Sequence, residues 1–128
     1  SFNQNTEEHS SSGLIVSTPA GSTGWLSSIF NMAYGVTNMF EKNLKPKRPK
    51  LKDNELLFAV REPFQSIRTQ TGITAGVIKN QSHLTIESLM PTNGIIFSDG
   101  IETDFLKFNS GSIATIGIAP ETARIVVK

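Results

Sequence analysis

The segment GLIVSTPAGSTGW (residues 13–25) changes in composition twice over a short distance. It opens with an apolar, strand-like run (13–16). Small and hydroxyl-bearing residues follow, and a helical pattern begins at Ser22. We therefore expect a buried strand over 13–18 that ends in a tight, glycine-rich corner from which a helix starts.

The residues after this corner have the periodicity of an amphipathic helix. Apolar side chains recur at alternating steps of four and three residues, which places them on one face of a helix. We expect this face to pack against the core. Its members are Trp25, Leu26, Ile29, Met32, Ala33, Val36 and Phe40.

The second half of the chain has a strand-like composition. Turn-forming residues separate its apolar runs, and the short spacing leaves no room for crossover helices, which favours antiparallel sheets. We predict one domain over residues 1–128 that is mainly β (α+β), with an antiparallel β-sandwich-like architecture and one main helix after the first strand. The expected later strands are 55–60, 72–78, 83–89, 94–97, 103–108, 112–118 and 123–127.

Three connecting segments also carry predictions. Residues 1–12 are polar and lack periodicity, so we expect a loop or a frayed end. Asp99-Gly100 should form a tight turn between strands, because such turns need residues with positive φ. The stretch 42–52 holds six Lys and Arg residues without interleaved aromatic residues, which is typical of a solvated loop. Phosphate binding by this stretch is the alternative.

Composition narrows the function classes. The net charge of +1 gives no electrostatic basis for binding nucleic acid or a membrane, and no apolar stretch reaches the roughly 18 residues of a bilayer-spanning helix. The absence of cysteine excludes disulfides and thiolate chemistry and fits a cytoplasmic protein. The polar start lacks an initiator Met and the pattern of a signal peptide, so we expect an excised domain.

The corner has the chemistry of a site for an anion or for the polar edge of a ligand. The first backbone amides of a helix lack intrahelical partners, and the helix dipole adds partial positive charge there. Glycines allow close approach of a ligand, and Ser22 and Thr23 supply hydroxyls that cap the helix or bind a ligand. Similar corners are common in proteins, and most bind nothing. The stretch also lacks the lysine of a phosphate-binding Walker loop.

The string at 13–25 resembles the signature of the NAD kinase family, which reads Gly, a few apolar residues, then Ser-Thr-Pro-x-Gly-Ser/Thr-Thr-Ala-Tyr. VREPF (60–64) and FSDGIETDF (97–105) resemble two further segments of that family more faintly. Ser12 is a departure, because the family has Asp before the glycine. The matching residues of the signature are Gly13, Ser17, Thr18, Pro19, Gly21, Ser22 and Thr23.

The resemblance implies a two-domain enzyme that transfers the γ-phosphoryl group of ATP to the 2′-hydroxyl of NAD and so makes NADP. A Gly-Gly-Asp-Gly loop in the N-terminal α/β domain would supply the catalytic Asp and handle ATP with a divalent metal, Mg²⁺. The C-terminal β-rich domain would hold NAD and help to assemble a homo-oligomer. Since these residues contain no Gly-Gly-Asp-Gly, we expect the chain alone to lack phosphoryl transfer and assign it no catalytic or metal-binding residue.

The resemblance also implies a set of ligand-binding residues. Thr23 and Ser28 would bring their hydroxyls to the adenine edge, and Gly24 would offer its backbone. Trp25 stands where the family usually has Tyr, so its ring would pack on the ligand, although it equally begins the expected core face. The predicted NAD-binding residues are Gly21, Ser22, Thr23, Gly24, Trp25 and Ser28.

Two other functions fit the sequence. One is a kinase that phosphorylates a lipid or another small alcohol, because lipid kinases share this architecture, although the Ser-Thr-Pro-x-Gly-Ser-Thr string argues against it. The other is a non-catalytic β-rich module for ligand binding or assembly. Ser12 in place of Asp favours this second alternative, because a carboxylate contact to the ligand is lost.

Overall fold

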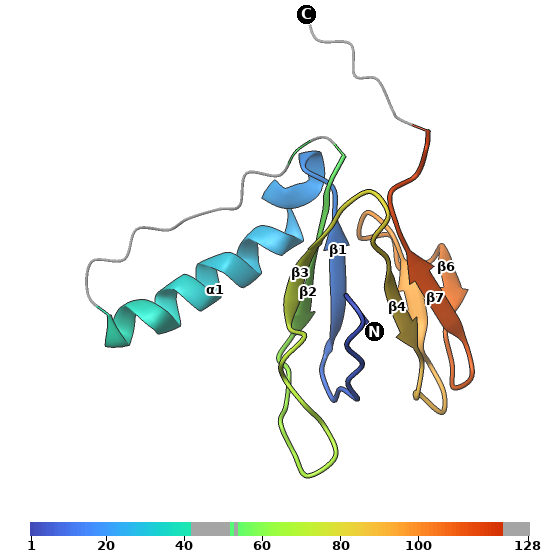
Figure 1. Cartoon of the computed structure of the whole chain (residues 1–128), viewed down its shortest axis with the longest axis horizontal. Helices are drawn as coiled ribbons and strands as arrows, with labels where there is room; N and C mark the ends of the chain where they lie inside the picture. The colour runs from blue at the N-terminus through green and yellow to red at the C-terminus, as the bar shows by residue number, and fades with distance from the viewer. Residues whose placement is uncertain (42–51, 53, 122–128) are drawn as a thin grey trace, which may run out of the picture.

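The computed structural model describes residues 1–41, 52 and 54–121 (Figure 1). The basic stretch 42–52, apart from Lys52, and the predicted strand 123–127 therefore lie outside the described residues. The elements in chain order are β1 (Gly13–Ser17), the 3₁₀ turn η1 (Ala20–Thr23), α1 (Trp25–Phe40), β2 (Leu56–Arg61), β3 (Ala75–Ile78), β4 (Leu84–Glu87), β5 (Ile95–Phe97), β6 (Phe105–Lys107) and β7 (Ile113–Ile116).

The strands form three small antiparallel sheets within the described residues. The largest has the order β1-β2-β3, with Phe58 of β2 paired to Val16 of β1 and to Gly76 of β3. Strands β4 and β7 form a second pair, and β5 and β6 a third. The mixed α+β class, the antiparallel pairing and the helix after the first strand are thus confirmed. No helix in the described ranges is long and apolar enough to cross a membrane.

The turn between β5 and β6 has the backbone that its sequence predicts. Asp99 and Gly100 both have positive φ, at 54° and 73°. The Ile101 amide donates a hydrogen bond to the Ser98 carbonyl at 3.1 Å and closes the turn. The prediction for Asp99-Gly100 is confirmed, because few residues other than Gly, Asn and Asp adopt this conformation readily.

The core consists of two clusters on opposite faces of β2. Leu57 and Ala59 pack with Leu26 of α1 on one face, and Phe58 packs with Ile78 and Leu84 on the other. This alternation follows from the period of two in a strand, since successive side chains point to opposite faces. β2 is therefore a central strand covered on both sides, by α1 on one face and by β4 on the other.

The packing of α1 differs from the prediction, because most of the apolar face that was expected in the core is exposed. Leu26 is buried, and Ile29 and Phe30 pack against the sheet. Trp25, Met32, Val36 and Phe40, in contrast, are 50%, 54%, 53% and 81% exposed. Ala33 is exposed as well, so the prediction that these five residues belong to the core was wrong. Only the first turns of the helix lie over the sheet, and the rest extends beyond it (Figure 1).

The start of α1 also differs from the prediction. The expected helix begins at Ser22, whereas a 3₁₀ turn occupies Ala20–Thr23 and the α-helix begins at Trp25. Gly24 separates the two with φ −80° and ψ −134°, which lies outside the helical region. The chain thus makes two short turns within the corner before the regular helix begins.

The N-terminal segment (residues 1–12) is irregular, but it is not frayed. The ring of Phe2 packs edge-on against that of Phe58, with 4.9 Å between centroids, and Phe2 also bridges to Leu84 of β4. The Ser1 ammonium group donates a hydrogen bond to the Thr85 carbonyl at 2.6 Å. The expectation of a frayed end was wrong because Phe2 completes the cluster around Phe58, a contact invisible to local sequence patterns.

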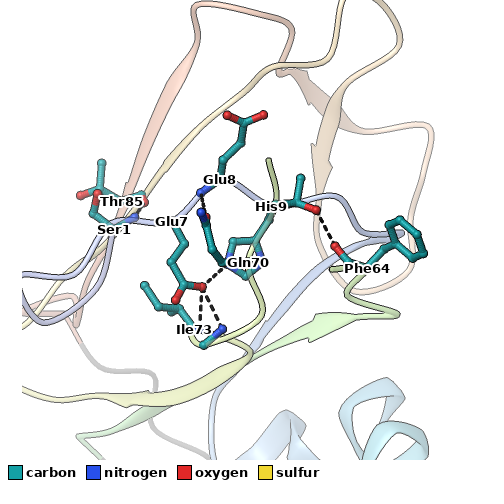
Figure 2. Close-up of polar contacts among 10 residues, drawn as sticks. Ser1, Glu7, Glu8, His9, Phe64, Gln70, Ile73 and Thr85 are labelled. Atoms are coloured by element: carbon teal, nitrogen blue, oxygen red, sulfur yellow. Dashed lines mark hydrogen bonds and ion pairs between the residues drawn. The ribbon is translucent and has the colours of Figure 1, made fainter. Parts of the chain in front are cut away.

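Glu7 anchors the middle of this segment (Figure 2). One carboxylate oxygen accepts hydrogen bonds from the amides of Gly72 at 3.0 Å and Ile73 at 2.9 Å, and lies 3.0 Å from Nε2 of His9. The hydrogen bond from the Ile73 amide, helped by those of His9 and Gly72, holds the pKa of Glu7 below its ordinary value of 4.5 although burial opposes this. The segment is thus tied by charge-assisted hydrogen bonds to the loop before β3.

Backbone hydrogen bonds continue this attachment on both sides of His9. The Gln70 amide donates to the Glu8 carbonyl at 2.9 Å, while the Gln70 side chain accepts from the Glu8 amide at 3.0 Å. The Phe64 amide donates to the Ser10 carbonyl at 2.8 Å (Figure 2). Residues 1–12 therefore follow the loop between β2 and β3 along much of its length.

We expect Gly76→Ala to lower the free energy of unfolding by about 1–3 kcal/mol. An added Cβ would lie 2.6 Å from Cε1 of Phe58 and 2.8 Å from Cε1 of Phe2, so the aromatic pair must shift. Urea denaturation measures the change. Gly35→Ala is the matched control, because a Cβ there meets open space and should raise stability by about 0.5–1 kcal/mol. A Gly76→Ala protein as stable as the parent would contradict the packing of Phe2.

We expect Glu7→Gln to weaken the fold in a pH-dependent manner. Because folding lowers the pKa of Glu7, its ionised form stabilises the native state at pH above its ordinary value, and this contribution is lost as pH falls through the folded-state pKa. Urea midpoints of the parent and the variant should therefore differ at pH 7, and the difference should shrink as the pH falls below 4.5 and through the folded-state pKa of Glu7. Glu8→Gln is the control, since Glu8 contacts Gln70 through its backbone. A midpoint difference that does not change with pH would contradict the role of the carboxylate.

Candidate functional site

The corner after β1 is built by hydrogen bonds between neighbouring residues. The Gly21 amide donates to Oγ1 of Thr18 at 3.1 Å, and the Ser22 hydroxyl donates to the Pro19 carbonyl at 2.7 Å. The Ser17 hydroxyl donates to the Thr18 carbonyl at 3.0 Å. The Ser-Thr-Pro-x-Gly-Ser order thus has a structural basis, because each hydroxyl closes part of the turn.

Both glycines of the corner sit close to other atoms of the same turn. A Cβ on Gly21 would lie 3.1 Å from Oγ of Ser17, and one on Gly24 would lie 3.3 Å from the carbonyl oxygen of Gly21. These distances are tighter than most Cβ contacts, so the compact turn itself favours glycine at both positions. Glycine at these two positions keeps the turn short and also leaves the backbone accessible.

The predicted ligand hydroxyls differ in availability. Ser22 donates its proton to Pro19, and Ser28 donates its proton to the Trp25 carbonyl at 2.7 Å, so each retains only its acceptor lone pairs for a ligand. Thr23 is exposed, and within the described residues none of the hydrogen bonds involves its hydroxyl. α1 begins at Trp25, and its N-cap residue, Gly24, provides no side-chain cap. Thr23 and the first amides of α1 are therefore the groups best placed for an incoming ligand.

A shallow pocket of about 170 Å³ lies between α1 and the end of β2. Trp25 and Ser28, two of the six predicted NAD-binding residues, line it, while the other four lie in the turn just before it. Pockets for drug-sized ligands usually have about 300–1,000 Å³. The pocket is thus large enough for one ring of a dinucleotide and leaves the remainder outside. It is lined by Trp25, Ser28, Ile29, Met32, Val60, Arg61, Glu62 and Pro63.

Trp25 lies between groups from two distant strands. The guanidinium carbon of Arg61 sits 4.8 Å from the centroid of its indole ring, and the Phe97 ring lies 6.3 Å from it at a tilt of 37°. The first contact is a cation–π interaction, which places a positive charge at the rim of the pocket. Glu62 partly offsets that charge, with 3.8 Å between its carboxylate and the guanidinium group. Sequence reasoning assigned no role to Arg61, because no local spacing indicates a contact between residues so far apart.

The described residues hold no group of three or more His, Asp or Glu side chains that could bind a metal ion. Comparisons with models of protein families, with curated proteins and with solved structures find no match for this chain. The resemblance to NAD kinases therefore depends on the signature residues of the corner, and what it implies remains a proposal.

Proposed function

We propose that this chain is the dinucleotide-binding part of an NAD kinase-like enzyme. The observation that carries the proposal is the string Ser-Thr-Pro-Ala-Gly-Ser-Thr (17–23), which lies on an exposed corner between a strand and a helix. The family signature and the chemistry of the corner point to the same ligand class. An uncapped helix start with nearby hydroxyls favours a polar or anionic ligand edge.

The surroundings of the corner support a nucleotide more than a simple anion. The Thr23 hydroxyl would meet the adenine edge, and the backbone of Gly24 would lie along the dinucleotide. The pocket lined by Trp25 and Ser28 has room for one ring, and an aromatic wall suits a flat heterocycle. Arg61, stacked on that wall, would supply positive charge near a phosphate.

In the proposed reaction, the 2′-hydroxyl of the adenosine ribose attacks the γ-phosphorus of ATP, a P–O bond forms to NAD, and ADP leaves. A Gly-Gly-Asp-Gly loop would supply the catalytic Asp and would bind the ATP phosphates together with Mg²⁺. These residues do not contain that loop. The part of this chain is to hold and orient NAD, and positioning is a large share of phosphoryl-transfer catalysis. A β-sandwich-like arrangement of the sheets, a homo-oligomer and a cytoplasmic location belong to the same proposal.

A non-catalytic assembly module is the second candidate. The apolar side chains exposed on α1 favour it, because large exposed apolar surfaces usually mark contacts with another molecule. Isothermal calorimetry of the chain with NAD, ATP and glycerol 3-phosphate, a lipid head-group analogue, separates the candidates. Binding of NAD in preference to the other two supports the proposed function. Binding of glycerol 3-phosphate alone would favour a lipid kinase relative, and binding of none would favour the assembly module.

We expect Thr23→Ala to weaken NAD binding by about 1 kcal/mol or more, which is about fivefold in Kd, if its hydroxyl meets the adenine. The emission of Trp25, the only tryptophan, gives a second readout at the pocket beside calorimetry. Thr37→Ala is the matched control, because its hydroxyl bonds to the Ala33 carbonyl at 2.8 Å, far along the helix from the corner. Equal affinity of the Thr23→Ala variant and the parent would remove Thr23 from the site.

A further inference from the structure

The exposed side of α1 carries a continuous apolar stripe. Its members are 50–81% exposed, although Trp25 and Met32 also line the pocket at the end of β2. They follow the steps of seven, four and three residues that occur along the contact line of paired helices. We call this surface the outward stripe. It consists of Trp25, Met32, Val36 and Met39, with Phe40 at its edge.

The charge of α1 restricts what could cover this stripe. None of the residues of α1 (WLSSIFNMAYGVTNMF) is Asp, Glu, Lys or Arg, whereas an exposed helix normally carries charge on its solvent side. A charged partner would gain no complementary contact here. A second copy of the same helix, in contrast, would meet no like-charge repulsion. The uncharged stripe is therefore compatible with itself, as a symmetric interface between two copies requires.

The pocket beside Trp25 provides a receptor for one end of such a helix. Its volume of about 170 Å³ is close to that of an engineered apolar cavity of about 150 Å³ that binds benzene. It thus fits a single phenyl ring. Phe40, the most exposed residue of the stripe at 81%, lies at the opposite end of α1 from this pocket. A ring and a ring-sized pocket at opposite ends of one helix are complementary only when two helices run antiparallel.

The spacing along α1 agrees with an antiparallel crossing at Met32. Trp25 lies seven residues before Met32, and Met39 lies seven residues after it, which is about 10 Å in either direction. When two copies cross at Met32, Met39 and Phe40 of each copy come opposite Trp25 of the other. The two-fold axis then places a phenyl ring at both pockets at once.

We propose that a second copy of this chain covers the outward stripe, with the two α1 helices antiparallel, crossing at Met32, and with Phe40 of each copy in the pocket beside Trp25 of the other. This inference does not depend on nucleotide binding. Stable interfaces bury about 800 Å² per subunit, and one face of a helix about 24 Å long provides less than that. The dimer should therefore dissociate on dilution.

Disulfide cross-linking tests the orientation directly, because the chain has no cysteine of its own. Met32→Cys should form a covalent dimer on mild oxidation. Ser28 and Val36 lie four residues to either side of Met32, so a mixture of the Ser28→Cys and Val36→Cys variants should give mainly the mixed dimer. Asn31→Cys is the matched control, since it is exposed and about 100° round the helix from Met32. Cross-linking at Asn31 equal to that at Met32, or mainly unmixed dimers, would overturn the proposal.

Sedimentation equilibrium of the unmodified chain tests the dimer itself. The parent should shift from monomer to dimer with concentration, and the emission of Trp25 should shift to shorter wavelength in parallel. Phe40→Ala and Met32→Glu should each raise the dissociation constant at least tenfold, whereas Asn31→Glu should leave it unchanged. Circular dichroism checks that each variant is folded. A parent that stays monomeric at all concentrations, or a Phe40→Ala variant that dimerises like the parent, would overturn the proposal.

Discussion

The two-sided burial of β2 is the constraint on which the rest of the structure depends. Leu57 and Ala59 face α1, and Phe58 faces the opposite cluster. Both edges of β2 are also paired, with residues 57–61 bonded to β1 and residues 56–59 to β3. Because β2 is covered on both faces, α1 must lie on one side and the N-terminal segment with β4 on the other. The corner at 17–24 is the connection that brings the chain from the sheet onto its helical side. Its compact turn is thus a requirement of the fold before it is a property of any site.

Helix α1 covers one face of β2, but the helix is longer than this packing requires. Leu26 and Phe30 pack against the sheet within the first turns of α1, so the remaining turns contribute little to this core. A helix that served the core alone could end near Phe30, and its distal part would then carry polar residues. The apolar, uncharged continuation to Phe40 therefore requires a second explanation, and contact with a surface beyond this core is the physical one.

The sequence predicted what depends on local chemistry and missed what depends on distant contacts. The strands up to residue 118, their antiparallel pairing and the Asp99-Gly100 turn follow from alternation and turn residues, and they agree with the structure. The periodicity of α1 identified a helix but could not show which of its apolar lines meets the sheet, because Leu26 and Trp25 are equally apolar neighbours. The docking of Phe2 on Phe58 and the stacking of Arg61 on Trp25 join residues far apart in the chain. No pattern along the sequence encodes such contacts.

The pocket at Trp25 connects the two proposals of function and assembly. It accepts one ring, and both a nucleotide base and the phenyl group of a neighbouring copy have that size. The two occupants would compete if both used the same space, since a pocket of this volume cannot hold both. Nucleotide binding would then favour the monomer, and the dimer would weaken the apparent affinity for nucleotide by the same factor. The geometry around Trp25 would thus couple the proposed ligand binding at the corner to the proposed self-association, with Arg61 at the rim available to either occupant.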